Sequence, residues 1–250
     1  MELTVTQKPW AISDRQLKKF SPKNIEHTLN SFNRICSGEY YMVDSFLKRM
    51  IVGSSDALFL CGYPKELLEK EGYDFYNRIL REDEHAWIKQ MNDAGFELFY
   101  ANPDFKHEKI LVTYDLAVVT KDGEELILTH KLVPYEFCKN DNLWLRLCHI
   151  MVSSSKEKNH DYTFFINTET GQRWVFTDGK YVLTDTPNIT PEEIHILRMM
   201  IKGLPDKQMH LAFDGLTLNT FKSKKQRLFE KLDVETSASA IHKAHLLGVI

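Results

Sequence analysis

Residues 189–204 read ITPEEIHILRMMIKGL, and residues 214–232 read DGLTLNTFKSKKQRLFEKL. In the first stretch, TPEE at positions 190–193 places a capping threonine, a first-turn proline and a glutamate at capping-box spacing. Gly203 is the matching stop signal. Apolar residues recur between these signals at helical spacing: Ile194, Leu197 and Ile201. The stretch therefore predicts a helix with one apolar face.

The second stretch starts with a turn and continues as a longer helix. DGLT at positions 214–217 is a tight turn that ends in Thr217, which is suited to cap a helix over Leu218–Leu232. A shorter helix is expected before it, from Asp206 to Phe213. One arc of the longer helix is apolar and consists of Leu218, Phe221, Leu228 and Leu232. The opposite arc is polar and consists of Asn219, Lys222, Ser223 and Gln226.

The charge of the chain limits where it can bind DNA. The 250 residues include 32 basic and 35 acidic side chains, so the chain lacks the basic excess of a non-specific polyanion binder. Residues 222–231, however, hold five basic residues against Glu230 alone. A helix with an apolar back and a front of amide, hydroxyl and ammonium groups can lie in the major groove, where these groups meet base edges. The sequence therefore predicts a local DNA-binding site.

Residues 189–250 as a whole resemble the DNA-binding domain of LuxR-type regulators. The matching positions are Ile189-Thr190-Pro191-x-Glu193, Leu197, Gly203-Leu204, Lys207, Thr220-x-Lys222, Leu228, Lys231-Leu232-x-Val234 and Leu247-Gly248-Val249-Ile250. The resemblance implies an all-α domain of four helices, in which the third reads the major groove of double-stranded DNA. It also implies that the fourth helix, about Ala238–Leu247, forms a homodimer contact.

Carried over position by position, the resemblance implies that Lys222, Ser223 and Gln226 face bases. It implies that phosphates are held by Thr220, Lys224, Lys225 and Arg227. The complete predicted DNA interface is Thr217, Asn219, Thr220, Lys222, Ser223, Lys224, Lys225, Gln226 and Arg227.

Four positions depart from the LuxR pattern. The turn at Asp214-Gly215 is one residue longer than usual, which would tilt the recognition helix. The other three are Pro205 in place of a capping serine, Phe221 in place of a valine and Asp233 in place of a glycine. These departures leave an alternative open: a PAS-based protein-interaction module whose degenerate helix-turn-helix no longer binds DNA. A gel shift on promoter DNA discriminates between the two hypotheses.

The first part of the chain combines helices and strands. Helical patterns cover Pro22–Ile35 and Asp56–Glu71, and short apolar segments lie between them at Tyr40–Val43 and Arg49–Val52. Strand patterns follow at Lys109–Thr120, Glu125–Phe137, Leu143–Ser153, Asp161–Asn167 and Arg173–Phe176. Their polar links, residues 121–124, 139–142 and 168–171, are of hairpin type, so we expect an antiparallel meander.

This order resembles a PAS domain, over roughly Glu39–Ser155. ALFLCGYPKELL at positions 57–68 matches the apolar helix, Gly-Tyr turn and Glu-Leu-Leu helix common in that family. ILREDE at 79–84 is similar to its "His-Pro-Glu-Asp" stretch, with Leu-Arg in place of His-Pro. The expected fold class is α+β, a PAS-like antiparallel sheet with flanking helices followed by the helix-turn-helix domain. The expected domains are an N-terminal helical segment (1–38), the PAS-like sensor (39–183) and the DNA-binding domain (188–250), divided at LTDTPN.

The aromatic residues Phe59, Tyr63, Phe75 and Trp87 are candidates for a ligand pocket of the sensor, although aromatic residues in such a domain are more often plain core. A small molecule or partner bound there would shift the population of a homodimer whose recognition helices match two half-sites.

The sequence favours neither catalysis nor metal binding. The four cysteines form no CxxC pair, the histidines are scattered, and nucleophile-elbow, HExxH and phosphate-loop motifs do not occur. We therefore expect no enzyme, no metal and no cofactor. MELTVTQKPW at the start resembles no signal peptide, and no apolar run is long enough to span a membrane, so the expected location is the cytoplasm.

Overall fold

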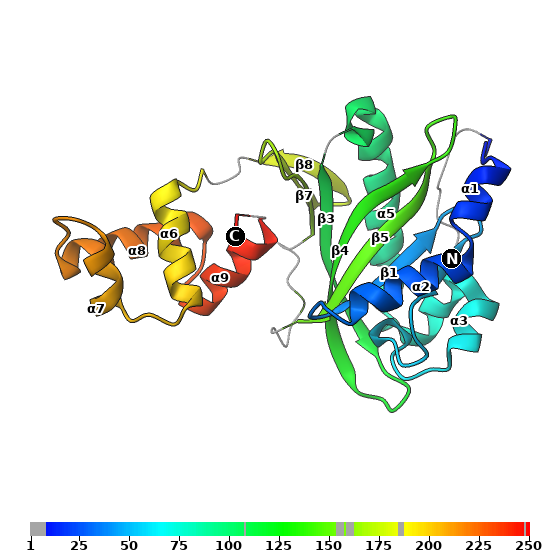
Figure 1. Ribbon diagram of the computed structural model, residues 1–250, viewed down its shortest axis with the longest axis horizontal. Helices are drawn as coiled ribbons and strands as arrows, with labels where there is room; N and C mark the ends of the chain where they lie inside the picture. Colours follow the sequence, from blue (N-terminus) through cyan, green and yellow to red (C-terminus); the bar gives the residue numbers. More distant parts are fainter. Residues whose placement is uncertain (1–8, 108, 154–157, 159–162, 185–187, 248) are drawn as a thin grey trace. The chain divides into compact units, whose positions relative to one another are not determined.

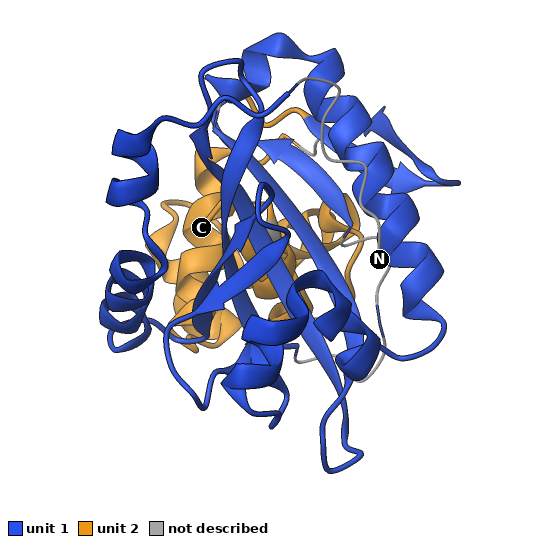
Figure 2. Ribbon diagram, turned by 90° about the vertical axis from the view of Figure 1, so that its right-hand side faces the viewer, with its two compact units in different colours: residues 1–169, 173–184 blue, residues 170–172, 185–250 orange. Residues whose placement is uncertain are grey.

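The computed structural model describes residues 9–107, 109–153, 158, 163–184, 188–247 and 249–250 (Figure 1). The chain forms two compact units, residues 1–169 with 173–184, and residues 170–172 with 185–250 (Figure 2). Part of the boundary expected at 183–188, namely residues 185–187, lies outside the described residues. Each unit has a hydrophobic core of its own.

The first unit is built on an antiparallel sheet with helices, so the predicted α+β class is confirmed. The sheet has the order β2-β1-β5-β4-β3-β6-β7-β8. Its strands are β1 (Glu39–Asp44), β2 (Arg49–Val52), β3 (Ile110–Val119), β4 (Glu125–Phe137), β5 (Leu143–Val152), β6 (Phe164–Asn167), β7 (Arg173–Thr177) and β8 (Lys180–Thr184).

The strand predictions from Lys109 onward are confirmed to within a few residues, but the simple meander is wrong. Strands β3, β4 and β5 follow one another as hairpins, whereas β6 pairs with β3 and not with β5. The reason is that β1 already occupies the free edge of β5, with Glu39 opposite Ile150. Residues 161–162 of the predicted fourth strand lie outside the described residues.

Two helical predictions need correction. The helix expected over Asp56–Glu71 is interrupted, because Cys61 and Gly62 have φ values of 49° and 81° and separate the 3₁₀ turn η1 (Leu58–Leu60) from α3 (Lys65–Glu71). The prediction also missed α5 (Glu84–Ala101), the longest helix among the described residues. The remaining elements are α1 (Asp14–Lys19), α2 (Pro22–Asn33), α4 (Tyr76–Ile79), η2 (Gly72–Phe75) and η3 (Pro103–Lys106).

Both faces of the sheet are covered. Side chains alternate along β1, so Tyr41 and Val43 join a large core with α3, α4 and α5, while Met42 joins a smaller one with Ile25 and Leu29 of α2. Helix α5 lies close to the sheet: a Cβ at Gly95 would come within 3.3 Å of the Phe165 ring.

The second unit is helical. It consists of α6 (Pro191–Ile201), α7 (Asp206–Met209), the 3₁₀ turn η5 (His210–Ala212), α8 (Leu218–Leu232) and α9 (Ser237–Leu246). The helix signals are confirmed: Thr190 and Glu193 form a reciprocal capping box, Gly203 has φ 70°, and Thr217 caps α8. The helix expected over Asp206–Phe213 is shorter, and its second half is η5. Of the closing residues matched to the LuxR pattern, Gly248 lies outside the described residues.

Removing the capping hydroxyl of Thr190 is expected to destabilise the second unit. In Thr190→Ala, the backbone N–H of Glu193 loses its acceptor at 3.3 Å, which costs about 1 kcal/mol. Urea unfolding followed by far-UV circular dichroism should show a lower midpoint. Thr190→Ser keeps the acceptor and should restore the midpoint, so equal destabilisation by serine and alanine would contradict this role.

Candidate nucleic-acid interface and ligand pocket

Helix α8 has one buried and one exposed side. Phe221, Leu228, Phe229 and Leu232 are buried in the core of the second unit. The exposed residues include seven of the predicted DNA contacts: Thr217, Asn219, Thr220, Lys222, Ser223, Gln226 and Arg227. The predicted base-facing row Lys222, Ser223 and Gln226 is thus open to solvent within this unit. The assignment of these residues to DNA stays a prediction.

The basic residues of α8 fall into two groups. Three of them form ion pairs inside the unit, Lys224 with Glu192 at 2.6 Å, Lys225 with Asp206 at 2.7 Å and Lys231 with Glu193 at 2.8 Å. Lys222 and Arg227 have no ion-pair partner in the part of the chain that the structure describes. The uncompensated positive charge of α8 is therefore smaller than the sequence suggested, and it lies at Lys222 and Arg227.

The paired lysines hold α8 against its neighbours. Glu192 and Glu193 belong to the first turn of α6, and Asp206 begins α7, so the three pairs join α8 to both helices. Although burial opposes ionisation of Glu193, hydrogen bonds from Lys231 and from Thr190 keep the pKa of its carboxyl below the ordinary value. The carboxylate therefore stays charged at neutral pH and retains the Lys231 ammonium.

The four predicted pocket residues do not line one cavity. Phe59 and Phe75 are fully buried, with ring centroids 6.1 Å apart, and Tyr63 packs edge-on against Phe75. Trp87 lies elsewhere: its ring contacts Phe176, and the Lys158 ammonium lies 3.1 Å from its centre. Three of the four therefore meet as packed core.

A cavity of about 40 Å³ lies instead between α5 and the sheet. Its walls include Met91, Phe96 and Phe99 from α5 and Ile110, Leu132 and Phe165 from the strands. Arg146 of β5 also lines it, and none of the four predicted pocket residues is among the described residues that do. The sequence held one signal for this site, which is a charged residue within an apolar strand. Arg146 interrupts LWLRLCHIMV, and the three residues before it, Leu143, Trp144 and Leu145, are buried.

Polar side chains gather in the same core. The Tyr41 hydroxyl lies 3.1 Å from Nδ1 of His130, whose ring stacks on Tyr114 with the centroids 4.9 Å apart. Burial lowers the pKa of His130 to about 3, and burial raises the pKa of the Cys148 thiol to about 12. Both groups are therefore neutral at pH 7, which is the form that a poorly solvated site favours.

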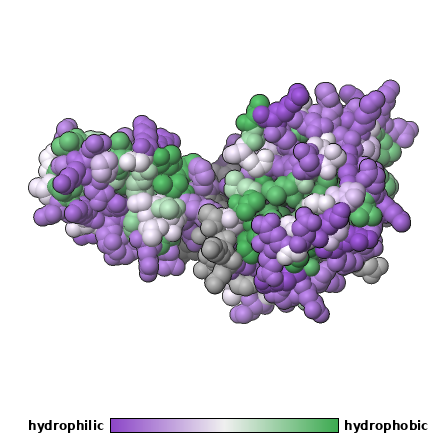
Figure 3. Space-filling view, turned by 90° about the horizontal axis from the view of Figure 1, so that it is seen from below, coloured by the Kyte–Doolittle hydropathy of each residue, from purple (hydrophilic) through white to green (hydrophobic). Residues whose placement is uncertain are grey.

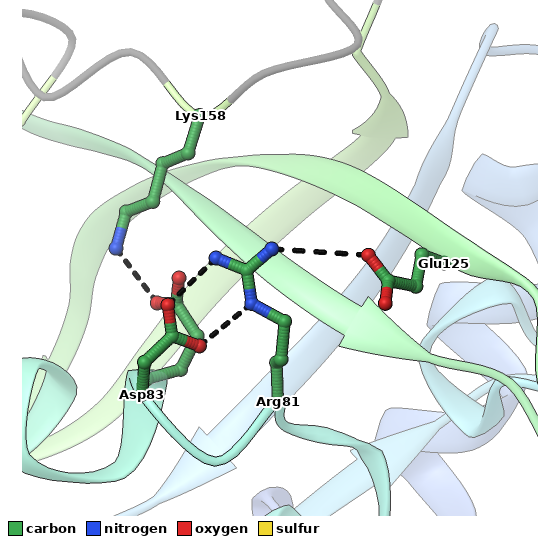
Figure 4. A network of polar contacts seen from close by, with 5 residues as sticks. Arg81, Asp83, Glu125 and Lys158 are labelled. Carbon is green, nitrogen blue, oxygen red and sulfur yellow. Dashed lines mark hydrogen bonds and ion pairs between the residues drawn. The ribbon is translucent and has the colours of Figure 1, made fainter.

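A second polar network closes the start of α5 (Figure 4). Arg81 forms an ion pair with Asp83 at 2.6 Å and reaches Glu125 of β4 at 3.8 Å. Beside it, the buried Lys158 and Glu84 pair at 2.7 Å. Each buried charge in this network lies beside an opposite charge. The network therefore stabilises the packing of α5 against its neighbours and offers no unpaired charge to a ligand.

The described residues give no sign of a metal site or of a membrane-spanning helix. Figure 3 shows hydrophilic side chains over most of the drawn face, with apolar stretches between them. Within the described residues, no three His, Cys, Asp or Glu side chains are grouped so as to hold a metal ion. The helices that the structure describes include none with the length and apolar character needed to cross a membrane.

Comparisons with known proteins give distant structural matches. No family model and no curated protein matches the sequence. The solved structures include the Vibrio cholerae VqmA dimer in the absence of target DNA, described as a LuxR-type receptor (12% identity, 88% of this chain and 86% of that one, TM-score 0.33). VqmA bound to DPO is 11% identical over 86% of this chain and 88% of that one, with a TM-score of 0.33. An RNA-binding light-oxygen-voltage receptor is 11% identical over 80% of this chain and 46% of that one, with a TM-score of 0.30.

Proposed function

We propose that the chain is a sequence-specific DNA-binding transcription regulator, in which the second unit binds double-stranded DNA through α8. The observation that carries this proposal is that α8 has two different sides: Phe221 and Leu228 are fully buried, and Lys222, Ser223 and Gln226 are exposed. Amide, hydroxyl and ammonium groups on one helical face can meet the donors and acceptors of base edges in the major groove.

The connection between α7 and α8 supports a helix-turn-helix. Gly215 in the turn has φ 72°, and Thr217 then accepts the backbone N–H of Thr220 at 3.2 Å, so α8 starts at a defined residue. The residues at the start of a recognition helix contact base edges, and the helix N-terminus favours nearby phosphates. Thr217, Asn219 and Thr220 occupy that position.

The ion pairs refine the roles within α8. Lys224 and Lys225 would have to exchange a carboxylate for a phosphate, so their net gain on binding DNA is reduced. Lys222 and Arg227 have no carboxylate partner among the described residues, so on binding DNA they give up only contacts with water. Arg227 therefore takes the main phosphate role, while Lys224 and Lys225 mainly hold the angle of α8.

The first unit completes the proposed regulator as a PAS-like sensor of a small molecule or partner. A signal bound there would shift the population of a homodimer whose two α8 helices match half-sites about one DNA turn apart. Such a protein acts in the cytoplasm and is not an enzyme. DNA affinity that stays the same with and without the identified signal would contradict the sensing role.

Binding to fragments of the native genome tests the proposal. Fluorescence anisotropy of the purified chain, measured against salt and against random competitor DNA, should reveal fragments that bind specifically with a steep salt dependence. Binding no better than to random DNA would contradict it. A second candidate function is a protein-interaction module, and it is favoured by the ion pairs that Lys224, Lys225 and Lys231 already form within the unit. Binding no better than to random DNA would support this second candidate.

Variants of α8 should separate base contacts from phosphate contacts. Gln226→Ala should relax preference at one base position by about 1–3 kcal/mol, and Lys222→Ala should do the same. Arg227→Ala should weaken binding to all sequences and reduce the salt slope by about 1, whereas Lys225→Ala should have a smaller effect. The exposed Lys202, outside α8, supplies the charge-matched control Lys202→Ala. Equal effects of Gln226→Ala and Arg227→Ala on all sequences would contradict the assignment.

A further inference from the structure

Arg146 is a charged side chain inside the core of the first unit. It lies on β5 opposite Val43 of β1, and only 6% of its surface is exposed. Its neighbours in the cavity are almost all apolar side chains of α5 and the sheet. An arginine keeps its positive charge under all ordinary conditions, so this position carries a full charge in a poorly solvated place.

The described contacts of Arg146 leave this charge without an anion. Its Nη2 donates to the Tyr73 hydroxyl at 3.3 Å, and its guanidinium carbon lies 5.1 Å from the centre of the Phe96 ring. Tyr73 in turn donates to the backbone oxygen of Asp44 at 3.4 Å. Within the described residues, Nε of Arg146 has no hydrogen-bond partner and the guanidinium has no ion pair.

Three other charged side chains with little exposure in this unit have an opposite charge nearby. Lys158 pairs with Glu84, and the buried carboxylate of Asp44 accepts from Trp144 and faces Arg49 at 3.4 Å. An isolated charge in such surroundings destabilises the fold unless it is paired and hydrogen-bonded. Arg146 is therefore suited to a bound anion that the chain itself does not supply.

The cavity beside Arg146 restricts what this anion can be. Its volume of about 40 Å³ gives room for a few non-hydrogen atoms, and its walls include Phe96, Phe99 and Phe165. A carboxylate matches the planar fork of a guanidinium and carries the single charge that one arginine compensates. A phosphate dianion needs more donors than these apolar walls offer, and a water molecule would leave the charge uncompensated.

We propose that this cavity binds a small organic monocarboxylate, with its carboxylate on the Arg146 guanidinium and its short apolar body against α5 and the sheet. The site takes ligand whether or not the chain binds DNA. Only the role of this ligand as a signal rests on the proposed function.

Direct binding to the full chain tests the site. The probes are formate, acetate, propionate and butyrate at pH 7, each compared with its neutral amide by calorimetry and by thermal unfolding. At least one carboxylate should bind and raise the unfolding temperature, and its amide, which has the same shape without the charge, should bind at least about tenfold more weakly. Absence of binding across the series, or equal binding of acid and amide, would overturn the proposal.

Two arginine variants locate the site. Arg146→Met should weaken binding of the tightest carboxylate by at least about tenfold, and Arg146→Lys should restore only part of it, because an ammonium lacks the fork. The matched control is Arg173→Met, which removes a buried arginine of β7 that faces Phe164 and does not line the cavity. Unchanged binding by a folded Arg146→Met would overturn the assignment.

A measurement on the unaltered chain covers the case in which Arg146→Met does not fold. In ¹⁵N-labelled protein, the carboxylate should shift the Nε–H resonance of Arg146, assigned by comparison with Arg146→Lys, and the amide should not. A carboxylate that binds without shifting this resonance would place the site elsewhere. DNA anisotropy with and without the carboxylate is read separately: binding of ligand with unchanged DNA affinity removes the sensing role and leaves the site.

Discussion

Replacing Phe221 with alanine is expected to unfold the second unit and abolish DNA binding while the first unit stays folded. The Phe221 side chain is fully buried, its ring centroid lies 5.8 Å from that of Phe213, and it belongs to the core that joins α6, α8 and α9. Deleting a buried phenylalanine costs about 3–5 kcal/mol. Because a unit of this size is only marginally stable, the loss exceeds what it can tolerate.

The tryptophans allow the two units to be followed separately. All four, Trp10, Trp87, Trp144 and Trp174, belong to the first unit. In Phe221→Ala, the tryptophan fluorescence transition in urea should match that of the unaltered chain, while far-UV circular dichroism shows a loss of helix. The half-exposed Phe32 of α2 gives the control Phe32→Ala, which should keep both signals. A folded second unit in Phe221→Ala would show that Phe221 is not central to its core.

Acidification is expected to destabilise the first unit through His130. Burial lowers the pKa of His130 from 6.5 to about 3, so the folded chain keeps this ring neutral while the unfolded chain protonates it. Between these two pH values the unfolded state binds more protons, and the stabilisation that is complete above pH 6.5 falls by about 1.4 kcal/mol per pH unit as the pH drops. Between pH 6.5 and 5 the loss is about 2 kcal/mol.

Comparison of two histidine variants isolates this effect. Burial also raises the pKa of Tyr41 and Tyr114, which face His130, so both stay neutral throughout this range. Urea unfolding of His130→Gln, followed by tryptophan fluorescence at several pH values, should show a shallower pH dependence than the unaltered chain. The exposed His27 provides the control His27→Gln, which should keep the full slope. Identical slopes for all three chains would mean that His130 does not hold a lowered pKa.

The helices of the second unit could be predicted because their signals are local. Thr190 with Glu193, Gly203 and Thr217 each act within one turn of the backbone, so sequence spacing alone marks where α6 and α8 begin and where α6 ends. The exposed side of α8 follows from helical periodicity in the same way. The ion pair of Lys224 with Glu192 joins residues of two different helices, and no local pattern encodes it.

The first unit was less predictable where its structure depends on contacts between distant residues. The β7–β8 hairpin had a local signal that was overlooked, since Asp178-Gly179 is a turn with φ values of 50° and 79°. Helix α5 gave a weaker signal, because Gly95 is a poor helix former that is explained only by the nearby Phe165 ring. Arg146 was missed for a related reason: its burial depends on strands and a helix that come from separate parts of the chain.

The position of β1 in the sheet also sets an order of events during protein synthesis. Glu39 and Asp44 lie opposite Ile150 and Leu145, residues that the ribosome adds far later. Until β5 has left the exit tunnel, β1 has only its short neighbour β2 to pair with, and the apolar side chains of Met42 and Ile51 have no Trp144 to cover them. The nascent N-terminal segment thus emerges with an open strand edge, the kind of surface that general chaperones protect.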